Sequence, residues 1–303
     1  MTARAADGGG KVIVGIDAGG SSTRVRAQAG SVLVFEGAGG PGNPVMTGPE
    51  TVRASYHAAL GGCPAASRVA ACVSGGGGPA QRAQIADLLS ARFPGANVYV
   101  APDHVGAFLA APPGSDICIL AGTGSAVCGR GADGGFVVSG GRGWILGDHG
   151  GAARLGQAAL EHYVRDVAGI PAPFTDAVKR LFGDADRRAV VHSVHAAQNP
   201  APLLARAAPL LTAAAEGGER WAIERLGLEM SALAFTAARH IDTYLPGTAT
   251  VHVAISGGVW SSPAAQAALT SALGQASSRP VTVTRSLADP VDGAVRLAAS
   301  LPL

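Results

Sequence analysis

The sequence is poor in charge, in lysine and in aromatic side chains. Only 15% of its 303 residues are charged and 5% are aromatic, and Lys11 and Lys179 are the only lysines among 23 basic residues. The arginines are scattered and the net charge is +2, so no nucleic-acid surface is indicated. No apolar run reaches the ~18 residues that a membrane span needs. We expect a globular protein, because 48% of the residues are hydrophobic, with neither nucleic acid nor a membrane as a partner.

Metal-binding cysteine pairs and several short catalytic signatures are also missing. The four cysteines, Cys63, Cys72, Cys118 and Cys128, form no Cys-x-x-Cys pair. This disfavours a zinc site or an iron–sulfur cluster and fits reduced, buried thiols in the cytoplasm. There is no Gly-x-x-x-x-Gly-Lys-Ser/Thr, His-Arg-Asp or Asp-Phe-Gly motif, which excludes the P-loop and protein-kinase folds. Residues 1–10 lack the apolar stretch of a secretory signal and are expected to form a short disordered tail.

What the chain has instead is 44 glycines and a pattern of elements that occurs twice. The first half predicts strands and helices in the order strand 11–16, strand 25–28, strand 31–36, helix 49–60, strand 68–74, helix 80–92, strand 97–100 and helix 103–111. The second half predicts strand 116–120, a hairpin turning at 133–135 with its return strand at 136–139, a helical block at 152–245, strand 250–256, helix 263–273, strand 280–285 and helix 290–299.

Two pairs of short segments align between the halves. Ala18–Thr23 and Ala121–Ala126 each follow the first strand of their half, and Val73–Gly76 and Ile255–Gly258 each follow a later strand. Both halves therefore have the order βββαβαβα, with a helical insert in the second. We expect two α/β domains facing a cleft. A chance match of two glycine-rich stretches is the alternative.

The loops after the two first strands are candidates for phosphate binding. Glycine lets the backbone approach an anion closely, and successive N–H groups in such a turn can hold phosphate. A carboxylate beside a polyphosphate is repulsive unless a cation lies between them, so Asp17 predicts Mg²⁺, bound through water. A single loop of this kind is more often a plain hairpin turn. Two loops together with Asp17 indicate a nucleotide held between the domains.

The segment 139–151 contains six glycines in thirteen residues and precedes a predicted helix. Backbone this free of side chains suits a polyhydroxylated ligand that must pass close to it. Asp148 could accept two sugar hydroxyls, or it could be the N-cap of the helix. Trp144 could stack on a sugar face, or it could be a half-buried core residue.

Four motifs, taken in this order, resemble a known family. They are the Asp17-x-Gly-Gly-Ser loop, the Gly122-Thr-Gly-Ser125 loop, the segment Gly140-Gly-x-Gly-x-x-x-Gly-Asp-x-Gly150, and Ser256-Gly-Gly-Val-Trp260. Together they look like the N-acetylglucosamine kinase branch of the BadF/BadG/BcrA/BcrD ATPase group, in the actin–hexokinase–Hsp70 superfamily. The resemblance covers residues 12–299 and implies two ribonuclease H-like, actin-like ATPase domains around a cleft. The first would comprise residues 11–115 and 288–303, and the second residues 116–287, with the helical insert at 152–245.

The resemblance also implies roles for individual residues. ATP with Mg²⁺ would be the cofactor and an amino sugar the substrate, phosphorylated on its 6-hydroxyl. The implied cofactor-binding residues are Asp17, Gly19, Gly20, Ser21, Ser22, Thr23, Gly122, Thr123, Gly124, Gly257 and Gly258, with Ser256–Trp260 bordering the adenosine. The implied sugar-binding residues are Asn43, Asp103, Ser125, Gly141 and Asp148, of which Asp103 would be the catalytic base. Asp103 has the alternative of being a helix N-cap.

The sequence departs from the family pattern beside the expected sugar site. His149 stands where most members have Glu, and Gly151 stands where many have Ser. N-acetylglucosamine and glucosamine are the expected substrates, and glucose and N-acetylmuramate remain open. Two other functions are alternatives, an ATPase activator of a dehydratase or reductase and a non-catalytic sugar- or nucleotide-binding regulator.

The helical block leaves the oligomeric state open. Trp221, Leu226, Met230, Leu233 and Phe235 form no single stripe, so they could pack within the domain or against a second copy in a homodimer. His192, His195 and His240 have no shared metal-ligand spacing and are expected to be surface or core histidines.

Overall fold

The computed structural model describes residues 11–165, 170–183 and 186–302. The expected tail at residues 1–10 lies outside the described residues, as do parts of the helical block at 166–169 and 184–185. The chain divides into two compact units, one formed by Met1–Ala110 with Ala288–Leu303 and the other by Ala111–Leu287. None of the helices in the described part of the chain combines the length and apolar character that crossing a bilayer requires.

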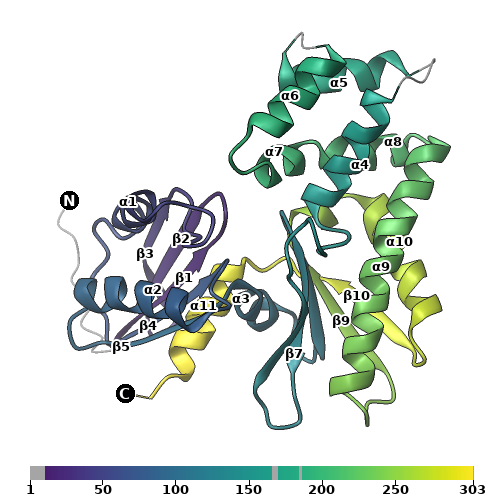
Figure 1. The fold of residues 1–303 in the computed structure, drawn as a ribbon. Helices are drawn as coiled ribbons and strands as arrows, with labels where there is room; N and C mark the ends of the chain where they lie inside the picture. The colour runs from purple at the N-terminus through teal and green to yellow at the C-terminus, as the bar shows by residue number, and fades with distance from the viewer. Residues whose placement is uncertain (1–10, 166–169, 184–185, 303) are drawn as a thin grey trace, which may run out of the picture. The chain divides into compact units, whose positions relative to one another are not determined.

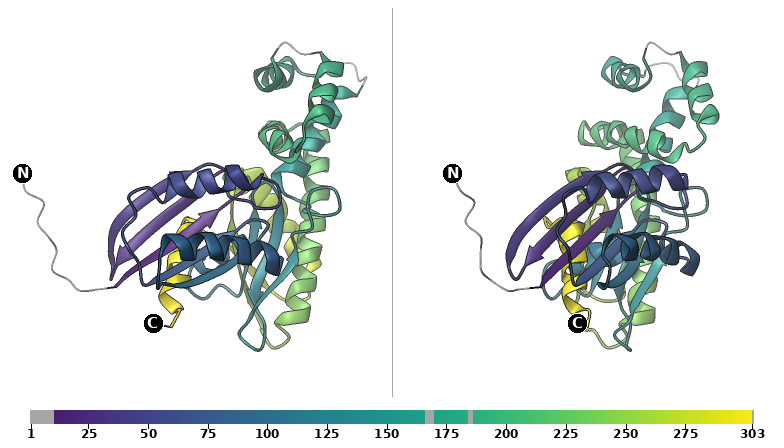
Figure 2. Two further views of the ribbon diagram at one scale, coloured as in Figure 1. Left: turned by 60° about the vertical axis from the view of Figure 1, so that its left-hand side comes forward. Right: turned by 90° about the vertical axis from the view of Figure 1, so that its left-hand side faces the viewer.

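The first unit is a five-stranded mixed sheet with helices on both faces (Figures 1 and 2). Its elements are β1 (Val12–Ala18), β2 (Thr23–Ala29), β3 (Val32–Gly39), α1 (Pro49–Ala59), β4 (Arg68–Val73), α2 (Pro79–Arg92), β5 (Asn97–Pro102), α3 (Asp103–Ala110) and α11 (Pro290–Ser300). The strand order is β3-β2-β1-β4-β5. The strands β1, β4 and β5 are parallel to one another, whereas β2 is antiparallel to both of its neighbours, β1 and β3.

The second unit repeats this sheet and adds helices. Its strands are β6 (Ile117–Ala121), β7 (Ser125–Arg130), β8 (Phe136–Gly140), β9 (Val251–Ser256) and β10 (Val281–Arg285). Its helices are α4 (Ala152–Val164), α5 (Ala172–Phe182), α6 (Arg187–Ala196), α7 (Ala201–Arg206), α8 (Ala208–Glu216), α9 (Arg220–Tyr244), the 3₁₀ turn η1 (Gly258–Ser261) and α10 (Pro263–Ala276). The strand order is β10-β9-β6-β7-β8. Read from β8, it is β8-β7-β6-β9-β10, which matches β3-β2-β1-β4-β5 of the first sheet element by element. The predicted duplication is therefore confirmed.

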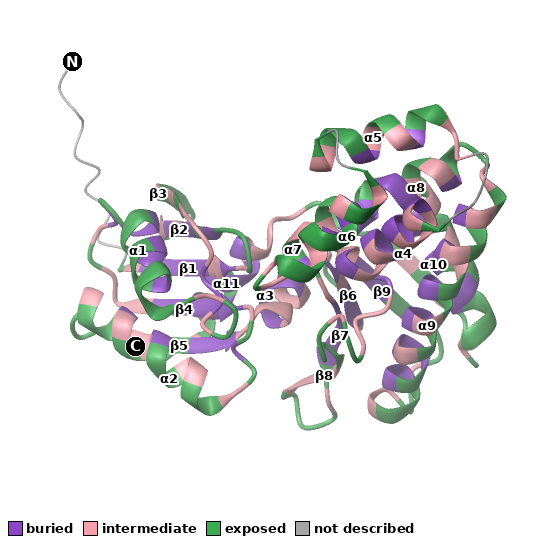
Figure 3. Ribbon diagram, turned by 45° about the horizontal axis from the view of Figure 1, so that its top comes forward, coloured by how far each residue is buried: buried purple, intermediate pink, exposed green. Residues whose placement is uncertain are grey.

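Apolar alternation explains which faces of the sheets are covered. On β1, Val14, Ile16 and Ala18 are buried against the face covered by α1 and α2. The opposite face of β1 meets α11, because a Cβ at Gly15 would lie 2.3 Å from the backbone nitrogen of Val295. Figure 3 shows the same concentration of buried residues along the inner strands of both sheets. All four cysteines are buried, as predicted for the thiols.

The structure shows how the hydrophobic residues of the helical insert pack within the second unit. Leu226, Met230 and Leu233 of α9 are buried in the core of the second unit. Trp221 is partly buried against that core, and Phe235 is 63% exposed. No partner chain is part of the structure, so the homodimer stays a prediction.

Helix α11 joins the first unit through contacts that admit no added side chain. A Cβ at Gly293 would lie 1.9 Å from the carbonyl oxygen of Gly106 in α3. Two ion pairs, Arg24 with Asp289 and Arg26 with Asp292, hold the start of α11 against β2. The chain therefore needs glycine at the α3–α11 crossing.

The substitution Gly293→Ala is expected to lower the free energy of unfolding by ~1–3 kcal/mol, because the helices must separate to admit a methyl group. Gly274→Ala in α10 is the matched control, since a Cβ at Gly274 meets no atom within 4 Å, and it should stabilise by up to ~1 kcal/mol. Urea unfolding measures both. Equal effects of the two substitutions would show that the crossing is not tightly packed.

His240 makes the stability of the protein depend on pH. It is fully buried in α9, its Nδ1 lies 2.9 Å from Ser139 Oγ, and its Nε2 has no hydrogen-bond partner. Burial lowers the pKa of His240 from 6.5 to about 4. Between these values the unfolded chain binds a proton that the folded chain does not, so stability falls as the pH falls through this window.

From pH 7 to pH 5, His240 should therefore remove about 2 kcal/mol of stability. The variant His240→Gln should lose correspondingly less over the same pH interval, as measured by urea unfolding at both pH values. An identical loss in the two proteins would mean that the buried imidazole is not the titrating group.

Candidate functional site

The residues predicted for the first unit lie at one edge of its sheet. Strands β1, β4 and β5 are parallel, so their carboxyl ends meet at the same edge. Asp17 is the penultimate residue of β1, Ser74 follows β4, and Asp103 follows β5 as the first residue of α3. The structure therefore brings Asp17 and Asp103 into one charged neighbourhood.

Asp17 has an unusual electrostatic environment. The pKa of Asp17 is raised from 3.8 to about 7, chiefly by burial; the charge of Arg24 lowers it and the charges of Asp103 and Asp289 raise it. Arg24 stands directly opposite Asp17 on the β1–β2 ladder and is paired with Asp289. An ionised Asp17 is thus poorly compensated by the protein alone.

A divalent cation would supply the missing compensation. Mg²⁺ prefers oxygen ligands and keeps several of its waters, and Asp17 offers a carboxylate with a second one, Asp103, in its electrostatic range. Within the described ranges, no three His, Cys, Asp or Glu side chains are arranged to hold a metal ion. A cation at Asp17 would therefore complete its shell with water and substrate oxygens, which fits Mg²⁺.

The first glycine loop is a closed turn. The N–H of Gly19 donates to the carbonyl of Ser22 at 2.8 Å, and a Cβ at Gly20 would meet no atom within 4 Å. Ser21 and Ser22 are exposed. Thr23 is different, because its side chain is fully buried and its hydroxyl donates to the carbonyl of Gly40. The structure thus uses Thr23 to hold the loop, and its hydroxyl is not presented to a ligand.

Asn43 is tied to the same edge. The N–H of Gly42 donates to the carbonyl of Gly19 at 3.0 Å, which joins this segment to the first loop. Asn43 Oδ1 accepts from the N–H groups of Val45 and Met46, and Asn43 Nδ2 lies 3.4 Å from Ser74 Oγ. The buried amide therefore shapes its own turn and retains donor capacity on Nδ2.

Asp103 contacts the protein through one of its carboxylate oxygens. Its Oδ1 accepts from the backbone N–H of His104 at 3.0 Å, and its side chain is 32% exposed. An N-cap accepts from the second or third helical N–H, which Asp103 does not do here. The geometry leaves the carboxylate accessible at the carboxyl edge of the sheet.

The second unit builds a corresponding edge from β6 and β9. The N–H of Gly122 donates to the carbonyl of Gly124 at 3.0 Å, and Thr123 is exposed. The first N–H groups of α4, those of Ala152 and Ala153, donate to the carbonyls of Gly122 and Thr123. The second loop is therefore fixed to the start of α4.

Asp148 lies against that loop. Its Oδ1 accepts from the N–H of Gly143 at 3.1 Å, and a Cβ at Gly124 would lie 2.2 Å from its Oδ2. The alternative that Asp148 is an N-cap is wrong, because the N-cap of α4 is Gly151 and no side chain caps this helix.

Ser125 and Gly141 lie beside Asp148. The N–H of Gly141 donates to the carbonyl of Ser125 at 3.0 Å. Ser125 is buried, and its hydroxyl donates to the carbonyl of His149 at 2.7 Å. The three sugar-binding residues predicted for the second unit are thus brought together. Trp144 is partly buried against the core of this unit.

The segment after β9 divides into an accessible and a buried part. Gly257 has a φ of +113°, and a Cβ there would lie 2.3 Å from the carbonyl oxygen of Ala121, so only glycine fits. A Cβ at Gly258 would meet nothing within 4 Å. Trp260 is fully buried and its Nε1 donates to the carbonyl of Ile119 at 3.2 Å. Trp260 therefore belongs to the core and presents no face to an adenosine.

Sequence reasoning missed Arg24, Asp289 and Glu229, which surround the predicted residues. Glu229 is buried in α9 and accepts hydrogen bonds from His149, Gly150 and Arg154. Its signal in the sequence is a carboxylate inside a run of otherwise apolar core positions on one helix.

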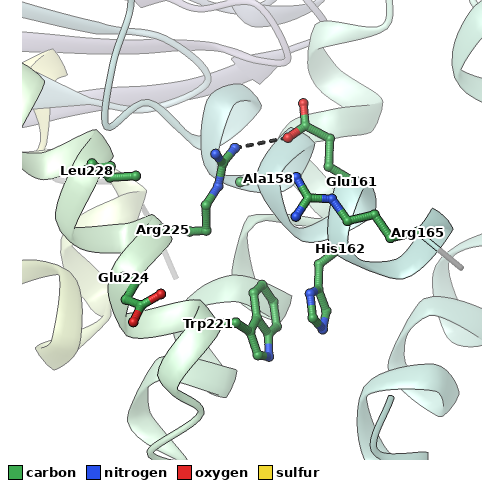
Figure 4. Close-up of a pocket in the computed structure, with 8 residues that line it drawn as sticks. All are labelled: Ala158, Glu161, His162, Arg165, Trp221, Glu224, Arg225 and Leu228. Carbon is green, nitrogen blue, oxygen red and sulfur yellow. Dashed lines mark hydrogen bonds and ion pairs between the residues drawn. The ribbon is translucent and has the colours of Figure 1, made fainter. Parts of the chain in front are cut away.

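The described part of the chain also contains a cavity of about 170 Å³ between α4 and α9, shown in Figure 4. There His162 and Trp221 stack with their ring centroids 3.6 Å apart, beside the Arg225–Glu161 ion pair. None of the predicted site residues lines this cavity.

Sequence comparison leaves the family open, because no protein-family model and no curated protein matches the chain. Solved structures do match. A provisionally assigned N-acetylglucosamine kinase from Chromobacterium violaceum has a TM-score of 0.73 at 25% identity, covering 95% of this chain and 99% of that one. Another from Porphyromonas gingivalis has a TM-score of 0.71 at 19% identity, covering 94% and 97%.

A ROK family glucokinase from Streptomyces griseus, solved with glucose and AMPPNP, has a TM-score of 0.60 at 16% identity and covers 96% of this chain and 100% of its own. The chain has the two-domain α/β fold of these actin–hexokinase–Hsp70-like kinases. The predicted fold class is confirmed. The assignment to the BadF/BadG/BcrA/BcrD group stays a prediction.

Asp17→Asn should separate stability from function. At pH 8 the variant no longer confines a charge in a buried site, so its Tm should rise by about 2–6 °C relative to the metal-free protein. Its Mg²⁺- and sugar-dependent ADP release should fall by ~100-fold or more. Asp87→Asn on the exposed face of α2 is the control and should change neither. A lower Tm for Asp17→Asn would contradict the electrostatic account.

Proposed function

We propose that the protein is an ATP-dependent sugar kinase that phosphorylates the 6-hydroxyl of an amino sugar, N-acetylglucosamine or glucosamine. The observation that carries the proposal is that Asp17 near the end of β1, Asn43 after β3 and Asp103 after β5 lie at one edge of the first sheet. The likeness to the kinase from Chromobacterium violaceum over nearly the whole chain supports the same class of reaction. Membership of the BadF/BadG/BcrA/BcrD group is part of this proposal.

Most of the site residues of the first unit would bind the metal, the phosphates or the sugar. Asp17 would hold Mg²⁺, which supplies neutralisation of phosphate charge when bound with ATP. The N–H groups of the Gly19–Ser22 turn and the exposed hydroxyls of Ser21 and Ser22 would contact phosphate oxygens. Asn43 Nδ2 would donate to a sugar oxygen.

Asp103 would act as the general base. Its carboxylate accepts the proton of the sugar O6 as the bond from O6 to the γ-phosphorus forms and the bond from that phosphorus to the ADP oxygen breaks. Positioning and charge neutralisation supply most of the acceleration in such transfers, and a base adds ~10²–10⁴-fold.

The second unit would supply the other predicted contacts. Gly122, Thr123 and Gly124 form a second turn suited to phosphate. After β9, Gly258 leaves open backbone, next to the close-packed Gly257. Ser125, Gly141 and Asp148 would bind sugar hydroxyls. The hydroxyl proton of Ser125 is already donated to His149, so we expect Ser125 to act as an acceptor.

The test is ADP release measured across a panel of hexoses with the wild-type protein. The proposal expects turnover stimulated most strongly by N-acetylglucosamine or glucosamine. Sugar-independent hydrolysis that responds to a protein partner would favour the ATPase activator, and binding without turnover would favour a regulator. Glucose or N-acetylmuramate as the preferred substrate would retain the kinase and overturn the amino-sugar assignment.

Asp103→Asn should reduce sugar-dependent ADP release by ~10²–10⁴-fold with little change in the KM for ATP, because the variant keeps the shape of the side chain and loses the base. Asp133→Asn, in the exposed β7–β8 turn, is the control. Activity of Asp103→Asn within threefold of wild type would exclude Asp103 as the base.

A further inference from the structure

Glu229 is a buried carboxylate that the proposed reaction does not use directly. It is 6% exposed and lies in the middle of α9, surrounded in sequence by core residues such as Leu226, Met230 and Leu233. Burying a charge costs free energy unless it is paired and hydrogen-bonded, and an apolar residue would serve helix packing alone at least as well. We therefore look for the role of Glu229 in the groups that it contacts.

All three partners of Glu229 follow Asp148 closely in the chain. Glu229 Oε2 lies 3.0 Å from His149 Nδ1 and accepts from the N–H of Gly150 at 3.2 Å. Glu229 Oε1 accepts from Arg154 at 2.9 Å. Although burial by itself would raise the pKa of Glu229, these donors hold it below its ordinary value, so the group is a carboxylate that accepts all three bonds.

Asp148 needs such support because of its backbone conformation. Its φ is +50°, and among the described residues it is the only non-glycine with positive φ. Such a conformation costs ~1 kcal/mol or more and persists where neighbouring contacts impose it. The next two residues, His149 and Gly150, are held by Glu229, and the carbonyl of His149 is held by Ser125.

We propose that Glu229 is a positioning residue for the sugar site, which fixes the backbone of Asp148 through His149 and Gly150 and so orients the Asp148 carboxylate. The inference rests on the proposed function, in which Asp148 binds the sugar. It also assigns a role to His149. Its ring is held by a buried acceptor on α9, where a glutamate at position 149 would face Glu229 with like charge.

The proposal expects a loss of sugar affinity with little loss of the chemical step. Glu229→Gln preserves the volume of the side chain but removes its charge and presents an N–H group to one of three donors. The KM for the sugar should rise about tenfold, whereas the KM for ATP should stay within twofold and kcat within threefold. A general loss of structure would not produce this split.

Two further variants complete the test. Glu224→Gln, on the same helix at an exposed ion pair with Arg220, is the matched control and should leave all constants unchanged. His149→Asn removes one link while leaving the Glu229–Arg154 pair intact, and the side chain of His149 is 42% exposed, so this variant decides the question if Glu229→Gln fails to fold. Its sugar KM should rise by about threefold to tenfold.

The outcomes separate the two proposals. A wild-type protein without sugar-stimulated ADP release would end the proposed function. An active wild type, with the sugar KM unchanged in a folded Glu229→Gln or in His149→Asn, would overturn the role of Glu229 alone. An equal rise in the KM values for sugar and ATP would also overturn it.

Discussion

The site depends on one constraint, the parallel pairing of the first strand of each sheet with the fourth. β1 pairs in parallel with β4, and β6 pairs in parallel with β9. This places the loops that follow those strands at one edge of each sheet, whatever their separation in the sequence. In the first unit that edge holds Asp17, together with the Asn43 segment that follows β3 and Asp103 that follows β5. In the second it gathers the Gly122–Gly124 turn and the Gly257–Gly258 backbone.

Two buried or nearly buried carboxylates illustrate how the fold treats charge. Glu229 receives donors from a side chain, a backbone N–H and a guanidinium, and its pKa is lowered. Asp17 has Arg24 as a counter-charge but is largely withdrawn from water and lies near Asp103 and Asp289, and its pKa is raised to about 7, chiefly by burial. A satisfied carboxylate holds the structure that surrounds it, whereas an unsatisfied one favours the binding of a cation. The difference is why we propose a positioning role for Glu229 and metal binding for Asp17.

Local sequence predicted most of the fold because many strands are β-branched and apolar, and because α1, α2, α10 and α11 begin at proline. The ends moved by a few residues, as for β5, which continues to Pro102 beyond the predicted Val100. The duplication was readable because equivalent glycine loops recur after equivalent strands. The sequence could not reveal which polar groups the fold itself uses. Thr23 and Trp260 match family motifs, yet one holds the backbone near Gly40 and the other packs in a core.

The contacts of His149 mark the same limit. Glu229 lies 80 residues away on α9, and only the packing of that helix against the loop makes them neighbours. A motif gives the residue types at a site and their order. The ion pairs and hydrogen bonds around those residues are made by side chains from distant elements. For this reason Arg24, Asp289 and Glu229 were found only in the structure.

The most direct test of a sugar kinase is the identity of its product. Phosphorus and carbon NMR of a reaction with ATP, Mg²⁺ and N-acetylglucosamine or glucosamine should show one ADP for each sugar phosphate, with the phosphate on the 6-position. Release of inorganic phosphate in place of a sugar phosphate, or phosphate on another sugar oxygen, would contradict the account.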